Sequence, residues 1–189
     1  MKRSEVNAII AHATEVFCRH GWTLPPNPRW DVTDFGFSDF KKYGLVLVNL
    51  TEQPEYCEKL MLCEHNQHVF AHTHRQKKED IISRFGTLAV QVWDSPEQKT
   101  GSKLTIQKNG APTEFRSGDI LYLKSGERVT LVPGVYHAFW AVGDYCVIGE
   151  VSTANDDRTD NFFVRKDIGR FPAIEEDAPP LARLVSEGN

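Results

Sequence analysis

Short apolar segments separated by turn residues fill the chain from Gly44 to Val151, and they constrain its fold more than any other feature. The segments are 45–50, 59–63, 69–74, 80–85, 87–93, 104–107, 120–123, 129–132, 137–142 and 145–151. Gly101-Ser102 and Lys108-Asn109-Gly110 are turn signals between them. Runs of this length and spacing are typical of strands, so we expect a mainly β protein, a jelly-roll barrel closed or built from two sheets.

A helix and two irregular segments are expected around the barrel. Ser4 and Glu5 suit a helix start, and Gly21 suits its end. Apolar residues recur between them at helical spacing: Val6, Ile9, Ile10, Ala13, Val16 and Phe17. The stretch 24–39 reads as an arm, with a short helical piece at 38–43. We therefore expect one domain, 1–189, with a helix and arm (1–43), a barrel (44–151) and an irregular segment over the barrel mouth (152–189).

Composition excludes several classes of protein. The chain has 189 residues, 40% of them hydrophobic, which fits a single domain with a sizeable core. A net charge of −4 argues against nucleic acid or an anionic membrane as partner. We expect no signal peptide, because Met1 to Val6 lacks an apolar run, and no apolar stretch has the length of a membrane span. Four cysteines without a Cys-x-x-Cys pair predict free buried thiols in a reducing cytoplasm.

Three histidines and one glutamate have the spacing of a metal site. His72, His74 and Glu79 lie in the run His-Thr-His-Arg-Gln-Lys-Lys-Glu, and His137 follows the pair Pro133-Gly134. In a strand, His72 and His74 point the same way, about 7 Å apart at the backbone. A hairpin through the polar turn 75–78 would return Glu79 beside them, and the Pro-Gly turn would aim His137. Such a set suits a divalent transition metal with positions open to a substrate.

The remaining histidines and the polar segments need separate interpretations. We expect His12, His20, His65 and His68 to be ordinary surface or core residues. Lys77 lies in the turn at the metal, where the field of a cation would lower its pKa and favour proton transfer. The run 150–161 is dense in carboxylates and amides, which hydrogen-bond sugar hydroxyls but also cap ordinary loops.

These residues resemble the two motifs of the cupin superfamily. His72, His74, Glu79 and Gly86 match the first motif, although Asn66 stands where its leading Gly would be. Gly126, Pro133 and His137 match the second motif, whereas Gly134 comes one residue early and Ala141 replaces its Asn. The metal ligands survive these departures.

A narrower resemblance comes from the residues after the last strand. The runs Glu150-Val-Ser-x-x-Asn-Asp-Asp-x-Thr-Asp-Asn and Arg170-Phe-Pro-x-Ile-Glu-Glu-Asp, beside the His72 to Glu79 motif, resemble the D-lyxose isomerase family. That family consists of cupin-fold, manganese-dependent aldose–ketose isomerases.

The resemblance implies a reaction and roles for residues. It implies D-lyxose to D-xylulose, with D-mannose to D-fructose as a second reaction, by proton transfer through a cis-enediol at a metal. Lys77 and Glu175, or Glu176 one residue on, are the expected acid–base pair. The expected sugar-binding residues are Glu150, Asp156, Asp160 and Arg170. Mn²⁺ is the expected ion, although Fe, Co and Ni suit the same ligands. A homodimer is the usual cupin arrangement.

Three other functions use the same metal motif. An iron cupin dioxygenase would need a largely apolar cavity and would consume oxygen. A cupin sugar-phosphate isomerase would need a basic clamp, and the sequence offers no cluster of cations beyond Arg75 to Lys78. A cupin that binds sugar without turnover, as a sensor or storage protein, would keep the metal and lack the proton carriers.

Overall fold

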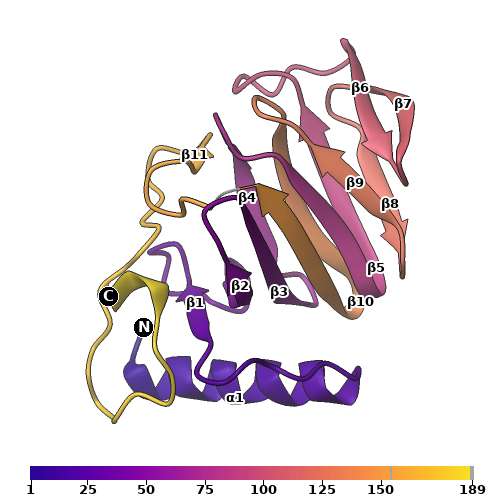
Figure 1. Cartoon of the computed structure of the whole chain (residues 1–189). Coiled ribbons are helices and arrows are strands. Elements are labelled where there is room, and N and C mark those ends of the chain that lie inside the picture. Colours follow the sequence, from indigo (N-terminus) through magenta and orange to yellow (C-terminus); the bar gives the residue numbers. More distant parts are fainter. Residues whose placement is uncertain (154, 188–189) are drawn as a thin grey trace.

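A computed structural model describes residues 1–153 and 155–187, which form an antiparallel sheet with one long helix beneath it (Figure 1). The helix is α1 (Arg3–Arg19), and a short 3-10 helix follows at Val185–Glu187. The strands are β1 (Arg29–Thr33), β2 (Leu45–Glu52), β3 (Tyr56–Glu64), β4 (His68–Thr73), β5 (Glu79–Trp93), β6 (Lys103–Lys108), β7 (Ala111–Arg116), β8 (Ile120–Lys124), β9 (Arg128–Leu131), β10 (Tyr136–Thr153) and β11 (Phe162–Phe163). The predictions of a mainly β protein and of an N-terminal helix are confirmed.

The sheet is not closed, which excludes the closed form of the expected jelly-roll barrel. Its strand order is β1-β2-β3-β10-β5-β9-β6-β7, with β4 on β10, β11 on β4 and β8 on β5. Within the described residues, β1 and β7 at the two ends do not pair. Trp30 of β1 instead forms a parallel bridge with Leu184 of the C-terminal segment. That bridge lies at the free edge of β1, whose backbone N–H and C=O groups would pair with another strand in a closed barrel.

Two long strands hold the sheet together, and each spans two of the predicted runs. The runs 80–85 and 87–93 form β5, and 137–142 and 145–151 form β10. Gly86 lies at φ +82°, and a Cβ there would lie 2.5 Å from the carbonyl oxygen of Tyr145. Opposite it, the register of β10 shifts between Val142 and Val147. Gly86, which separates the predicted runs 80–85 and 87–93, therefore marks a bulge inside a continuous strand pair. It does not mark a turn between two strands, and only glycine fits at this position.

Four further local predictions were wrong. Strand β1 lies in the stretch that was read as an arm, and β7 lies in a stretch without a predicted strand. The piece 38–43 is a single turn, closed by a hydrogen bond from the Tyr43 amide to the Asp39 carbonyl. Cys18 is exposed, whereas the other three cysteines are buried, and all four are free.

Apolar side chains form two cores on opposite sides of β2 and β3. One fills the concave side of the sheet and includes Leu47, Met61 and Phe139. The other lies between the sheet and the apolar stripe of α1, where the rings of Phe17 and Trp30 stack at 6.2 Å between centroids. The predicted helix stripe is therefore core. No helix of the described chain is long and apolar enough to span a membrane.

The C-terminal segment has two parts with different surroundings. Its first part adds β11 to β4, which places Phe163 opposite His72. Its second part runs along the start of α1 (Figure 1), where Arg3 binds the carboxylates of Glu176 at 2.7 Å and Glu187 at 2.5 Å. Of these two parts, only the one that contains β11 reaches the region of the histidines.

Candidate metal site and cavity

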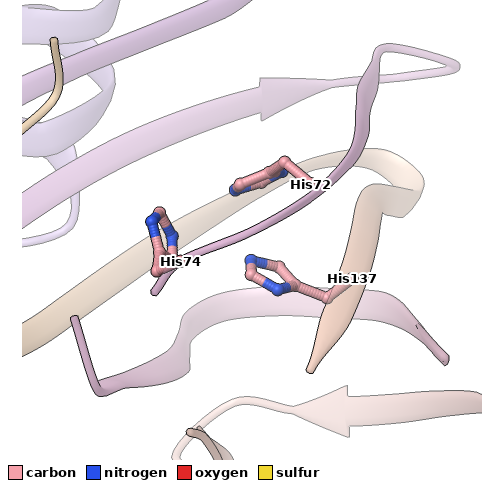
Figure 2. A group of neighbouring side chains, drawn as sticks. All are labelled: His72, His74 and His137. Carbon is pink, nitrogen blue, oxygen red and sulfur yellow. The ribbon is translucent and has the colours of Figure 1, made fainter. Parts of the chain in front are cut away.

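Three histidines converge on one another (Figure 2). His72 lies in β4, His74 follows the end of that strand, and His137 lies in β10 opposite His72 in register. All three are buried, and one ring nitrogen of each lies within 4.8 Å of the others. The amide of Gly134 donates to the carbonyl of His74 at 2.9 Å, so the Pro-Gly turn is tied to the same cluster.

Glu79 joins the histidines from the first residue of β5. Its Oε1 lies 3.4 Å from His74 Nε2 and 3.1 Å from His137 Nε2. The expected hairpin does not bring it there, because β4 and β5 do not pair, and Glu79 lies opposite Ser152 and Leu131 instead. The three atoms are buried and none has a hydrogen-bond partner. Such orphaned groups are costly in an interior, and a divalent cation would satisfy all of them.

The other ring nitrogens prepare the histidines for ligation. Each Nδ1 lies near a backbone carbonyl, which can only accept a hydrogen bond and so assigns the proton to Nδ1 and the lone pair to Nε2. The pairs are His72 with Phe70 at 2.8 Å, His74 with Asp160 at 2.6 Å and His137 with Val135 at 3.3 Å. Burial, together with His137 and His74, lowers the pKa of His72 well below its usual value, which keeps it neutral. Neutral imidazoles are the form that binds metal.

Lys77 lies beside this cluster and between two buried carboxylates. Its Nζ is 2.7 Å from Glu79 Oε2 and 3.0 Å from Glu150 Oε1. Burial would lower the pKa of Lys77, but Glu150 and Glu79 outweigh burial and raise it above its usual value. Glu150 and Glu79 therefore act against the lowering of the Lys77 pKa that a metal alone would cause. Conversely, burial would raise the pKa of Glu79, and the charge of Lys77 keeps that pKa well below its usual value.

A second set of buried charges continues from Glu150. Lys59 lies opposite Glu150 on β3, and its Nζ is 3.1 Å from Asp157 Oδ1. Arg170 makes a two-pronged ion pair with Asp31. Lys59 and Asp157, which line the cavity, and Asp31, which pairs with Arg170, were not predicted from the sequence. The available signal was Lys59 itself, because it occupies an inward position of β3, two residues before the buried Met61.

One cavity connects the metal cluster with these charges. Counted with the solvent at its mouth, it has a volume of about 430 Å³. Its polar wall consists of Lys59, His72, Lys77, Glu79, His137, Glu150, Asp157, Asn161 and Arg170. Its apolar wall includes Phe35, Met61 and Phe163. The cavity can therefore bind a small polar molecule against proton-carrying groups.

Comparison with known proteins agrees with this geometry. The sequence model of the D-lyxose isomerase family matches residues 27–188. The chain belongs to the D-lyxose isomerase family. It is 35% identical to the D-lyxose/D-mannose isomerase of Escherichia coli O157:H7, over 99% of this chain and 98% of that protein. It is 34% identical to the enzyme of the same name from Serratia proteamaculans, over 99% and 97%.

Solved structures share the fold of this D-lyxose isomerase family member. The L-ribose isomerase of Acinetobacter sp. DL28, solved with L-ribose, matches with a TM-score of 0.71 at 16% identity, over 93% of this chain and 98% of that one. The L-ribose isomerase of Cellulomonas parahominis, also with L-ribose, gives 0.70 at 16% identity, over 92% and 98%. At this identity, the likeness concerns the fold alone.

The sugar-binding residues predicted from the D-lyxose isomerase resemblance lie in different places. Glu150 and Arg170 line the cavity. Asp160 is buried behind His74, with its carboxylate on the backbone of the turn 75–77. Asp156 is exposed outside the cavity, where it caps a turn through the amides of Arg158 and Thr159.

Glu175 does not meet the expectation for an acid–base residue at the metal. Its side chain is exposed, and its backbone pairs with Met1 and Arg3 at the start of α1. The structure brings Lys77 together with Glu150 instead. The physical reason is the path of the C-terminal segment, which leaves the cavity after Arg170 and follows the helix.

Proposed function

We propose that this chain is a metal-dependent aldose–ketose isomerase that converts D-lyxose to D-xylulose and D-mannose to D-fructose. Membership of the D-lyxose isomerase family and the two curated relatives support the sugar class. One observation carries the chemistry. Three imidazoles converge with Glu79, and the orphaned atoms His74 Nε2, His137 Nε2 and Glu79 Oε1 lie beside the cavity in which Lys77 and Glu150 form a buried, hydrogen-bonded pair.

The donor set fits a divalent ion, with Mn²⁺ as our choice. The Nε2 atoms of the three histidines and Oε1 of Glu79 would hold it. When bound, such an ion acts as a Lewis acid that stabilises negative charge on the C1 and C2 oxygens of the open-chain sugar. Glu79 also remains hydrogen-bonded to Lys77 through Oε2, which fixes its orientation.

Glu150 and Lys77 are the proton carriers of this proposal. A Glu150 oxygen takes the proton from C2, and the electron pair of that bond forms the C1–C2 double bond. The π pair of the C1 carbonyl moves to O1, which takes a proton from Lys77 and completes a cis-enediol. Glu150 then returns its proton to C1, while O2 gives its proton to the neutral Lys77 as the C2 carbonyl forms, and the product is the ketose. Lys77 holds the Glu150 carboxylate, because its Nζ lies 3.0 Å from Oε1 of Glu150. In this proposal Lys77 also donates to the sugar oxygens. Glu150 takes the role expected for Glu175, which lies outside the cavity.

Both proposed sugars present the same groups to this pair. D-lyxose and D-mannose share their configuration at C2 and C3, and mannose has one more carbon. The buried charges of Lys59, Asp157 and Arg170 lie in the same cavity and can bind hydroxyl groups of either sugar.

The alternatives fit the cavity less well. A dioxygenase would favour an apolar pocket, whereas one wall here is charged. A sugar-phosphate isomerase would need free cations, but Lys59 is paired with Asp157 and Arg170 with Asp31. A sugar-binding protein without turnover would have no use for the Lys77–Glu150 pair.

A ketose assay tests the proposal. Metal-stripped protein reloaded with Mn²⁺ is incubated with D-lyxose and with D-mannose, and xylulose and fructose are measured over time. We expect ketose in both reactions, and none from the metal-stripped protein. Metal-bound protein without ketose would contradict the proposal, and oxygen uptake would then point to the dioxygenase. The homodimer stays a prediction, which light scattering of the purified protein would test.

A further inference from the structure

We propose that Asp160 is a positioning residue, which fixes the metal ligand His74 and the turn that carries Lys77. This inference rests on the metal site of the proposed function. It differs from the role in sugar binding that the sequence suggested for Asp160.

Asp160 uses both its backbone and its side chain on one short turn. Its carbonyl accepts from His74 Nδ1 at 2.6 Å. Its carboxylate accepts from three consecutive amides: Arg75 at 2.8 Å, Gln76 at 3.2 and 3.3 Å, and Lys77 at 2.9 Å. Consecutive amides that converge on one point form an anion-binding concavity, and hydrogen bonds to a charged acceptor are the strong ones.

These contacts leave the carboxylate no role at the sugar. Asp160 is 7% exposed and does not line the cavity, whereas its neighbour Asn161 does. Both carboxylate oxygens are already occupied by backbone amides. A substrate hydroxyl would therefore have to displace contacts that hold the turn in place.

The geometry gives Asp160 control over two groups of the site. The carbonyl contact keeps the proton of His74 on Nδ1, so that Nε2 keeps its lone pair for a metal. The carboxylate contacts set the backbone from Arg75 to Lys77, and hence the point from which Lys77 reaches Glu79 and Glu150. Asp160 is in turn held by a hydrogen bond from its own amide to the carbonyl of Asp156. Metal ligation thus depends on the segment after β10, which supplies no ligand itself.

Two variants and a matched control test this role. Asp160→Ala removes every carboxylate contact, and Asp160→Asn keeps the volume and one acceptor oxygen but turns an amide donor toward the backbone N–H groups. Asp167→Asn is the control, because Asp167 is an exposed acid of the same segment that pairs with Arg165. Mn²⁺ affinity is measured by calorimetry, and the tautomer of His74 in metal-free protein by ¹⁵N NMR of its imidazole.

We expect Asp160→Ala to weaken Mn²⁺ binding about 10- to 100-fold, as loss of a group that orients a metal ligand typically does. Asp160→Asn should weaken it less, with a fall in kcat larger than any change in KM, and Asp167→Asn should bind like the wild type. The wild type should show His74 protonated at Nδ1. Asp160→Ala keeps the backbone carbonyl at position 160 but loses the carboxylate contacts that hold this carbonyl against the turn, so it should show a mixture of tautomers. If Asp160→Ala does not fold, Asp160→Asn carries the test.

Two results would overturn the inference. One is wild-type Mn²⁺ affinity in a folded Asp160 variant, with only thermal stability reduced. The other is a raised KM with unchanged metal affinity, which would make Asp160 a sugar-binding residue. Metal affinity and the His74 tautomer are both measured without turnover. A failure of the proposed isomerase activity can therefore be distinguished from a failure of the role proposed for Asp160. A wild type that binds no Mn²⁺ would overturn both proposals.

Discussion

The ammonium group of Lys77 lies 3.0 Å from the carboxylate of Glu150, and both are buried beside the histidine cluster. The two residues come from a turn and from a strand that are 73 positions apart in the chain. Their contact places a proton donor and a proton acceptor next to a candidate metal site.

Removal of one imidazole should abolish metal binding and activity together. In His74→Ala, the remaining ligands are too few to hold the ion against water. Bound metal is measured by mass spectrometry and ketose formation by enzymatic assay. His65→Ala is the control, because His65 contacts the carbonyl of Gly143 and lies outside the cluster. Full activity in His74→Ala would rule out this metal site.

Loss of Lys77 should separate turnover from metal binding. Lys77→Ala keeps the four ligands, so we expect bound Mn²⁺ and a kcat lower by about 10²- to 10⁴-fold, the usual contribution of a proton carrier. Lys78→Ala, which alters the neighbouring exposed lysine, should behave like the wild type. A higher KM with an unchanged kcat would make Lys77 a substrate-binding residue instead.

Two glutamate variants distinguish the carboxylate of the cavity from that of the C-terminal segment. Glu150→Gln keeps the shape and removes the base, so kcat should fall about 10²- to 10⁴-fold. Glu175→Gln should retain activity, because the backbone of Glu175 pairs with Met1 and Arg3 at the start of α1 and its exposed side chain does not line the cavity. Steady-state kinetics on D-lyxose compare the two. The reverse pattern would restore Glu175 as the catalytic acid–base and contradict our assignment.

The buried ion pair of Asp157 and Lys59 should make stability depend on acid pH. Burial would raise the pKa of Asp157, but Lys59 and Arg170 outweigh it and hold that pKa below its usual value. A depressed carboxylate pKa stabilises the fold above the unfolded pKa of about 4, and this stabilisation is lost as the pH falls through the lower folded pKa.

Asp157→Asn tests this relation by urea unfolding. We expect the free energy of unfolding to fall by about 3–5 kcal/mol at pH 7, because Lys59 loses a buried partner. The difference from the wild type should shrink by roughly 1.4 kcal/mol per pH unit below about pH 4. Asp144→Asn, at an exposed position, serves as the control. A difference that stays constant with pH would contradict the assigned ion pair.

The sequence by itself determined the parts of this protein that depend on local pattern. The helix stripe from Val6 to Phe17 and most of the strands follow from the spacing of apolar residues. The histidine spacing was also sufficient, because alternation along a strand is local and a His-x-His pair points one way. Family resemblance added Glu150 and Arg170, which lie in the cavity.

Tertiary structure alone decided how these parts meet. The open sheet and the continuity of β5 and β10 depend on pairing between strands far apart in the chain, which no local pattern encodes. The same holds for the carboxylates that were expected at the site. Glu150, Asp160 and Glu175 all lie in polar stretches, yet one lines the cavity, one holds the turn at His74 and one lies on α1. Their roles differ because each is set by the partners that long-range packing brings to it, and not by the residue type.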